Sequence, residues 1–145
     1  MGSWTDFVGD EYKAFSGTAV YTTTINKVPV ADVIKLDLGS VAENASVYLN
    51  GDYIGTVIDS PYQLYIPAEK FKGQDELVVR VANSMANRIA YMDKKGVDWK
   101  IFYNVNMSAR KKENVKNGIF DASDWEPKSS GLLGPVTLTP AMVKQ

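Results

Sequence analysis

The sequence predicts an all-β fold, an antiparallel β-sandwich of the jelly-roll type, and three observations support that prediction. Apolar and polar side chains alternate with a period of two over most of residues 15–82. Glycine, proline and asparagine interrupt the alternation at short intervals, as turn residues do. No long helical pattern separates the six β-runs, and short strands joined by tight turns are typical of a sandwich.

The first two runs lie at residues 15–27 and 33–39. Residues 15–27 are rich in threonine, valine, tyrosine and isoleucine, which suit a pleated surface. In 33–39 the apolar side chains Ile34, Leu36 and Leu38 alternate with polar ones, which predicts a strand with one buried face.

Residues 46–58 predict a β-hairpin. Asn50-Gly51 stands between two β-rich runs, and this dipeptide readily adopts the positive φ angles of a type I′ turn. Pro61 then separates the hairpin from a run at 62–66, where Leu64 and Ile66 share a face. A turn at 72–75 precedes the sixth run.

The sixth run, 76–82, is followed by a long connection. Three inward side chains are expected in this run: Leu77, Val79 and Val81. Residues 83–92 predict a short helix and 100–107 a further strand. The last run, 132–138, contains Pro135, which cannot donate to a strand ladder, so we expect it at a sheet edge or beginning near residue 136.

The expected domain organisation is a single sandwich domain over residues 15–140. Its long connection covers about 84–130, and a connection of that length in a compact domain is usually functional or docks against something else. Residues 1–14 are expected to be an N-terminal extension, in which Met1-Gly2-Ser3 could be an expression scar, and 141–145 a C-terminal tail. The chain would then be one domain of a longer protein.

Composition excludes several function classes. The 145 residues include 16 basic and 17 acidic side chains but neither histidine nor cysteine. A Ser-His-Asp or Cys-His nucleophile and a zinc site with imidazole or thiolate ligands are therefore excluded. No apolar stretch approaches a membrane span, and the N-terminus lacks the pattern of a signal peptide.

Aromatic side chains gather in the long connection, where they could bind a sugar. They are Tyr91, Trp99, Phe102, Tyr103, Phe120 and Trp125. An exposed aromatic ring can stack on the apolar face of a sugar while polar neighbours bond its hydroxyls. The candidate stacking residues are Trp99, Tyr103 and Trp125, and the candidate polar contacts are Asn87, Arg88 and Asp98. The favoured alternative is that these aromatics are packing residues, because aromatics are large hydrophobic groups first.

Two charge clusters in the connection could bind a ligand other than a sugar. Seven basic residues fall within 94–116 beside aromatics, as in a groove for single-stranded nucleic acid, but a solvated loop is favoured because the whole chain has a net charge of −1. Asp121, Asp124 and Glu126 could offer oxygens to calcium. Their spacing fits no EF-hand, and a helix N-cap at Ser123 or Asp124, or a solvated turn, is favoured. No other cofactor is expected.

Several segments in order resemble known glycoside hydrolases. VYLNGDYIGTV (47–57), PYQLYIP (61–67) and GQDELVVRVAN (73–83) resemble the galactose-binding-like, sugar-binding domain of family 2 enzymes. FSGTAVYTTTI (15–25), LDLGSVAENASVYLNG (36–51) and SGLLGPVTL (130–138) are similar to the C-terminal β-sandwich of bacterial α-L-rhamnosidase-like enzymes, as is NSMANRI (83–89). Residues 90–129 match neither pattern.

The resemblance implies a non-catalytic accessory domain of a bacterial polysaccharide-degrading enzyme. Its partners would be carbohydrate and the catalytic domain of the parent enzyme, and its location periplasmic, cell-surface or secreted. Neither nucleic-acid binding nor a membrane span is expected. Two alternatives stay open: a purely structural domain that binds no glycan, and an autonomous glycosidase that uses a carboxylate pair.

Overall fold

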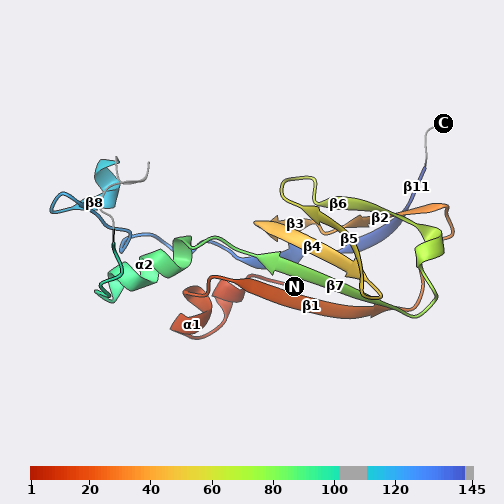
Figure 1. Cartoon of the computed structure of the whole chain (residues 1–145), viewed down its shortest axis with the longest axis horizontal. Coiled ribbons are helices and arrows are strands. Elements are labelled where there is room, and N and C mark those ends of the chain that lie inside the picture. The colour runs from red at the N-terminus through yellow and green to blue at the C-terminus, as the bar shows by residue number, and fades with distance from the viewer. Residues whose placement is uncertain (102–110, 143–145) are drawn as a thin grey trace. The chain divides into compact units, whose positions relative to one another are not determined.

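The structure is a computed structural model, and it describes residues 1–101 and 111–142. The chain forms two compact units (Figure 1). The sandwich unit comprises Met1–Trp4, Gly17–Asn83 and Ser129–Gln145. The helical unit comprises Thr5–Ser16 and Ser84–Lys128. Each unit therefore contains segments that are far apart in the sequence.

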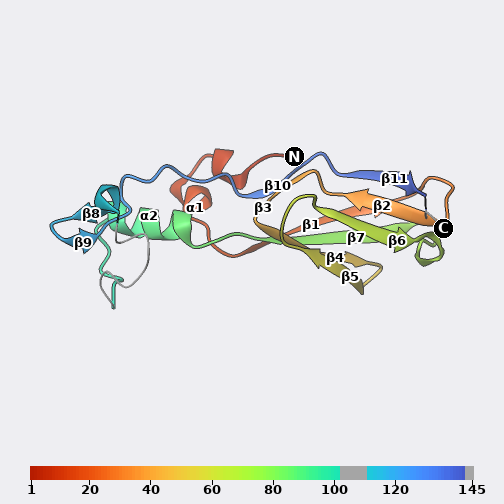
Figure 2. The same ribbon diagram turned by 90° about the horizontal axis from the view of Figure 1, so that it is seen from above.

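The sandwich unit contains antiparallel sheets that pack against each other. One sheet has the strand order β1-β7-β4-β5 and another β11-β2-β6, while β10 pairs with β3. Figure 2 shows the same strands in a view turned by 90°. The bounds are β1 (Thr18–Ile25), β2 (Val33–Asp37), β3 (Ser40–Ala42), β4 (Asn44–Leu49), β5 (Asp52–Val57), β6 (Gln63–Pro67), β7 (Asp75–Ala82), β10 (Gly131–Gly134) and β11 (Thr137–Ala141). A 3-10 turn, η2 (Ala68–Lys70), follows β6.

The core lies between the facing sheets. Burial alternates strictly along β4 and β7, as expected for strands with one inward face. Ile34, Leu36 and Leu38 are almost completely buried, and Leu77, Val79 and Val81 pack with Leu36 and Leu38 in one cluster. The predicted β-sandwich and these predicted inward faces are confirmed.

The Asn50-Gly51 turn joins β4 to β5 as predicted. Both residues have positive φ angles, 52° and 86°, which is the type I′ combination. The Asn50 side chain also donates to the buried carboxylate of Asp75 (2.7 Å), and its Oδ1 accepts the backbone N–H of Glu76 (3.0 Å). Asn50 thus serves both the turn and the neighbouring strand.

Pro135 divides the predicted last run into two strands. β10 ends at Gly134 and pairs with β3, and β11 begins at Thr137 and pairs with β2. The missing N–H of proline ends the ladder on one strand before the next begins. The two alternatives expected for this run both hold for β11, which begins at Thr137 and stands at the edge of its sheet, and the strand before the proline is a finding of the structure.

The helical unit has less regular structure. Its elements are α1 (Asp10–Lys13), α2 (Ala86–Lys94), η4 (Lys112–Asn114), β8 (Val115–Lys116) and β9 (Ile119–Phe120). A further 3-10 turn, η1 (Trp4–Asp6), spans the boundary between the units. The helix predicted at 83–92 is confirmed as α2. The strand predicted at 100–107 lies largely outside the described residues.

A second Asn-Gly hairpin, β8–β9, was not predicted. Asn117 and Gly118 have φ angles of 52° and 78°, the same combination as Asn50-Gly51, and Val115 pairs with Phe120. The flanking strands have two residues each, too few for alternation to be visible in the sequence. Within the described residues, no helix is long and apolar enough to cross a membrane.

Candidate functional site

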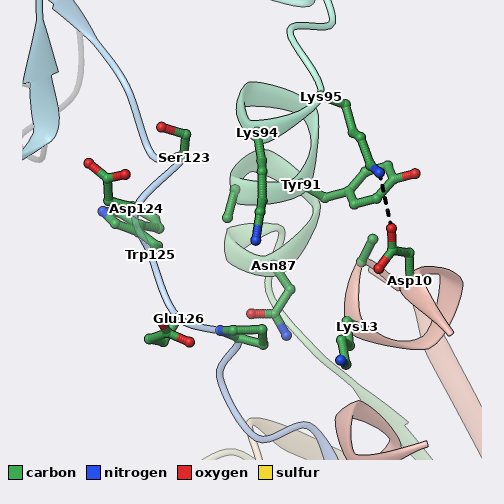
Figure 3. Close-up of a pocket in the computed structure, with 13 residues that line it drawn as sticks. Asp10, Lys13, Asn87, Tyr91, Lys94, Lys95, Ser123, Asp124, Trp125 and Glu126 are labelled. Atoms are coloured by element: carbon green, nitrogen blue, oxygen red, sulfur yellow. Dashed lines mark ion pairs between the residues drawn. The ribbon is translucent and has the colours of Figure 1, made fainter. Parts of the chain in front are cut away.

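A hollow of about 370 Å³ opens in the helical unit (Figure 3). It is lined by α1, one face of α2 and residues 123–127. The α2 face consists of Asn87, Ala90, Tyr91 and Lys94, which are three, four and seven residues apart and therefore lie on one side of a helix. The volume is within the range of small-ligand pockets.

Asn87 holds one wall of the hollow in place. Its Nδ2 donates to the carbonyl of Lys128 (2.8 Å), and its Oδ1 accepts the N–H of the same residue (2.8 Å). The side chain is 5% exposed. Asn87 was predicted as a polar sugar contact. In the structure, its amide ties α2 to the chain that follows residues 123–127.

Trp125 forms part of the opposite wall. Its indole Nε1 donates to Asn114 Oδ1 (2.9 Å), and its ring meets Phe120 edge to face, with centroids 5.8 Å apart. These two contacts fix the ring in a partly buried position. Trp125 therefore presents a rigid aromatic surface to the hollow, which suits a binding wall.

Trp99 belongs to the small apolar cluster of the helical unit rather than to the lining of the hollow. It packs with Phe120, Ala122 and Ala90. Its Nε1 donates to Asp93 Oδ1 (2.7 Å). The packing interpretation of the aromatics thus describes the contacts of both tryptophans, and Trp125 alone of the two also lines the hollow.

Asp93 connects three parts of the helical unit. Its side chain is 1% exposed and forms an ion pair with Lys100 (2.5 Å). Oδ2 accepts the backbone N–H of Ala122 (2.8 Å), and Oδ1 accepts the Trp99 indole. Sequence reasoning missed this residue because a single aspartate in a polar stretch carries no pattern that marks it as buried.

The remaining predicted contacts do not line the hollow. Arg88 is exposed, with its guanidinium carbon 5.9 Å from the centroid of the Tyr91 ring. Asp98 is exposed. Tyr103 lies outside the described residues. The structure therefore brings Asn87 and Trp125 together and leaves Arg88, Asp98 and Trp99 elsewhere in the helical unit. A carbohydrate role for these residues stays a prediction.

Charges around the hollow are partly neutralised by ion pairs. Lys95 pairs with Asp10 (3.2 Å), and the hydrogen bond and charge of Asp10 raise the pKa of Lys95. On the opposite wall, Asp124 pairs with Lys116 (3.0 Å), and chiefly this hydrogen bond raises the pKa of Lys116. Lys13 and Lys94 also line the hollow, and neither has an ion pair with a described residue.

The acidic cluster at 121–126 is held by its own neighbours. Asp121 Oδ1 accepts the Ser123 N–H (2.9 Å) and pairs with Lys116 (3.4 Å). The hydrogen bond from the Ser123 hydroxyl is the main cause that lowers the pKa of Asp121. No helix begins at Ser123 or Asp124, so the N-cap expectation is wrong, whereas the expected turn lies at these two residues. The described residues contain no cluster of three metal-ligating side chains.

Nearly the whole chain is similar to segments of longer proteins. No protein-family model matches the sequence. A protein of Formosa agariphila named "Putative beta-glucuronidase" is 33% identical to this chain over an alignment of 153 residues. The alignment covers 95% of this chain and 13% of that protein. The structure of a rhamnosidase from Novosphingobium sp. PP1Y has 29% identity and a TM-score of 0.73, and the match covers 94% of this chain and 12% of that enzyme.

These matches agree with the resemblance at the level of glycoside hydrolases. In both cases the chain spans only about an eighth of the length of the relative. The chain is therefore homologous to a small segment of a protein named as a glucuronidase and of a rhamnosidase.

Proposed function

We propose that this chain is a non-catalytic accessory domain of a bacterial glycoside hydrolase. The observation that supports this most directly is the extent of the matches: almost the whole chain aligns with only 12–13% of two much longer proteins. Their names describe hydrolysis of glycosidic bonds. On this proposal the catalytic carboxylates belong to another domain, and the chain alone releases no chromophore from aryl glycosides. Release at a rate above the buffer would contradict it.

The helical unit would supply the glycan contact through its hollow. Trp125 and Tyr91 line the space with aromatic surface, while Ser123 and Glu126 provide groups that bond hydroxyls. A pocket with aromatic walls and a few polar groups is a typical small-ligand site. Because the Trp125 ring is held by Asn114 and Phe120, little order has to be gained on binding.

Calorimetry with a panel of plant and host oligosaccharides tests the glycan contact. We expect binding that is lost in Trp125→Ala and weakened in Tyr91→Ala. The matched control is Tyr65→Ala, because Tyr65 is an exposed aromatic on β6 in the sandwich unit. Far-UV circular dichroism verifies that each variant is folded. Absence of heat with every glycan, or unchanged binding in both hollow variants, would rule out the contact.

A second candidate is a purely structural domain that binds another part of its parent enzyme. It is favoured by exposed apolar side chains in the first segment of the helical unit: Phe7 is 56% exposed, Val8 96% and Tyr12 43%. Phe7 and Tyr12 form an edge-to-face pair with centroids 5.4 Å apart. An apolar surface of this kind often marks an interface.

Light scattering on the isolated chain separates the structural candidate from the glycan-binding one. An interface left uncovered predicts concentration-dependent self-association that Phe7→Ser and Val8→Ser reduce. Val30→Ser, an exposed apolar position of the sandwich unit, is the control. A chain that stays monomeric at high concentration would count against the structural candidate and leave glycan contact as the function.

A further inference from the structure

We propose that the hollow of the helical unit binds a sugar that carries one carboxylate, a uronic-acid unit, through the ammonium groups of Lys94 and Lys13. This inference rests on the glycan contact proposed above and specifies its ligand class. It follows from the distribution of charge around the hollow and from the direction of two lysine side chains.

The ion pairs leave two lysines of the lining without a described counter-ion. Asp10 is paired with Lys95 (3.2 Å), and Asp124 is paired with Lys116 (3.0 Å). Lys13 and Lys94 line the same hollow, and neither forms an ion pair or a side-chain hydrogen bond with the described residues. Glu126 is the remaining carboxylate of the lining without a described partner. The balance of unpaired charge in the hollow is therefore positive.

The two lysines border the same part of the hollow. Lys94 is seven residues after Asn87 on α2, so the two side chains lie on one helix face. In Figure 3 the Lys94 side chain runs along α2 toward Asn87, and Lys13 of α1 lies on the other side of Asn87. Ammonium groups from two elements, both exposed, thus line the same hollow. A carboxylate placed there would receive charge-assisted hydrogen bonds, which are stronger than neutral ones.

Arg88 adds to the positive potential on this side, whereas the charge of Lys95 is paired with Asp10. The ring of Tyr91 lies under Lys95 Nζ at 5.5 Å and Arg88 Cζ at 5.9 Å from its centroid. Both are exposed, so their effect on the hollow is screened by salt. Arg88 favours an anion on the α2 side of the hollow without belonging to its lining.

The charge balance of the lining favours a ligand with a single negative charge. Asp10 and Asp124 are paired, so two unpaired lysines face one unpaired carboxylate, Glu126, and this small excess of positive charge does not suit a polyphosphate, a nucleic acid or a densely sulfated chain. The same carboxylates accept hydrogen bonds from hydroxyl groups. A ligand with one carboxylate at one end and several hydroxyls elsewhere matches both sides, and a uronic acid has this composition.

Calorimetry on the full chain with paired ligands tests the assignment. The probes are the single sugars galacturonic acid and glucuronic acid, each as the free acid with one carboxylate and as the uncharged methyl ester. We expect at least one free acid to bind about 1.5- to fivefold tighter than its ester, as for exposed charge pairs. Lys94→Gln and Lys13→Gln should each reduce this preference, while Lys27→Gln, an exposed lysine of the sandwich unit, should not.

The outcomes separate this inference from the proposed function. Equal affinity for acid and ester, with both lost in Trp125→Ala, would overturn the acidic ligand and leave the glycan contact standing. A preference for the acid that survives both lysine changes, or inhibition by inorganic sulfate at the concentration of the sugar, would overturn the assigned position. Binding of neutral glycans alone also overturns the inference, and binding of no glycan overturns the proposed contact as well.

Discussion

The two units of this chain differ in the contacts that stabilise each of them internally. In the sandwich unit, one cluster of thirteen buried apolar residues fills the space between the sheets. Among the described residues, the corresponding cluster of the helical unit has three, Ala90, Phe120 and Ala122, with the partly buried Ile89, Trp99 and Trp125 around them. In the described part of the helical unit, the buried carboxylate of Asp93 and the amide of Asn87 join segments that are far apart in the sequence.

This difference indicates that the stability of the sandwich unit is distributed over many side chains, whereas that of the helical unit depends strongly on a few. Apolar burial is non-directional, so a large core spreads its contribution over many side chains. A buried carboxylate contributes through a few directional bonds, and removing it leaves its partners without compensation. We therefore expect single substitutions to be most damaging at Asp93, and the following experiments test this comparison.

The largest expected effect is that of Asp93→Ala. The change leaves Lys100, whose side chain is 17% exposed, without its carboxylate partner. It also removes the acceptor of the Trp99 indole and of the Ala122 N–H. Breaking a buried pair in this way costs about 3–5 kcal/mol. Hydrogen exchange should show rapid exchange in α2 while β4 and β7 stay protected. Asp98→Ala, at an exposed acid, is the control, and full protection of α2 in Asp93→Ala would refute the comparison.

Leu36→Ala tests the apolar core of the sandwich unit. Leu36 is completely buried in β2, and a leucine-to-alanine change in a core costs about 3 kcal/mol. Urea unfolding followed by far-UV circular dichroism should show a lower midpoint for the β-sheet signal. Val20→Ala, at an exposed position of β1, should leave the midpoint within about 0.5 kcal/mol of the parent. Equal effects of the two changes would argue against an apolar core at Leu36.

Acid should weaken the sandwich unit through Asp75. Burial raises the pKa of this carboxyl, but hydrogen bonds from Asn50 and from the N–H groups of Lys72 and Gly73 outweigh it, so the pKa lies below its ordinary value of 3.8. A carboxyl with a depressed folded-state pKa adds stability that is present above 3.8 and is lost as the pH falls through the folded value.

Urea unfolding between pH 7 and pH 2 measures the contribution of Asp75. In the parent, the midpoint should fall most steeply below pH 4, and in Asp75→Asn it should start lower and fall less. Asp52→Asn, at the exposed start of β5, serves as the control. If the midpoint of Asp75→Asn falls below about pH 4 as steeply as that of the parent, other carboxyl groups cause the loss of stability in acid.

The smallest expected effects come from a matched pair of glycines. Gly51 and Gly118 occupy the second position of the two Asn-Gly turns, with φ angles of 86° and 78°, and an added Cβ would meet no atom within 4 Å at either one. Alanine therefore costs only backbone strain, about 1–2 kcal/mol. Gly51→Ala should lower the urea midpoint of the sheets, whereas Gly118→Ala should speed hydrogen exchange in the helical unit alone. The same response to both changes would indicate one cooperative unit.

The sandwich strands could be predicted from the sequence because their pattern is local. A period of two identifies a half-buried strand within a few residues, and Asn50-Gly51 identifies its turn. The helical unit offers weaker signals. The Asn117-Gly118 dipeptide could have revealed β8–β9, and the spacing of Asn87, Tyr91 and Lys94 could have revealed the helix face that lines the hollow.

The sequence by itself determined the β-sandwich, its inward faces, its first hairpin and the short helix, since each follows from periodicity or turn chemistry within one segment. Tertiary structure decided what the polar and aromatic residues of the long connection do. Asp93 became a buried ion-pair partner, Asn87 a clamp on Lys128, and Trp125 a wall of the hollow. Such roles depend on partners distant in sequence, 41 residues away for Asn87, and no local pattern encodes them.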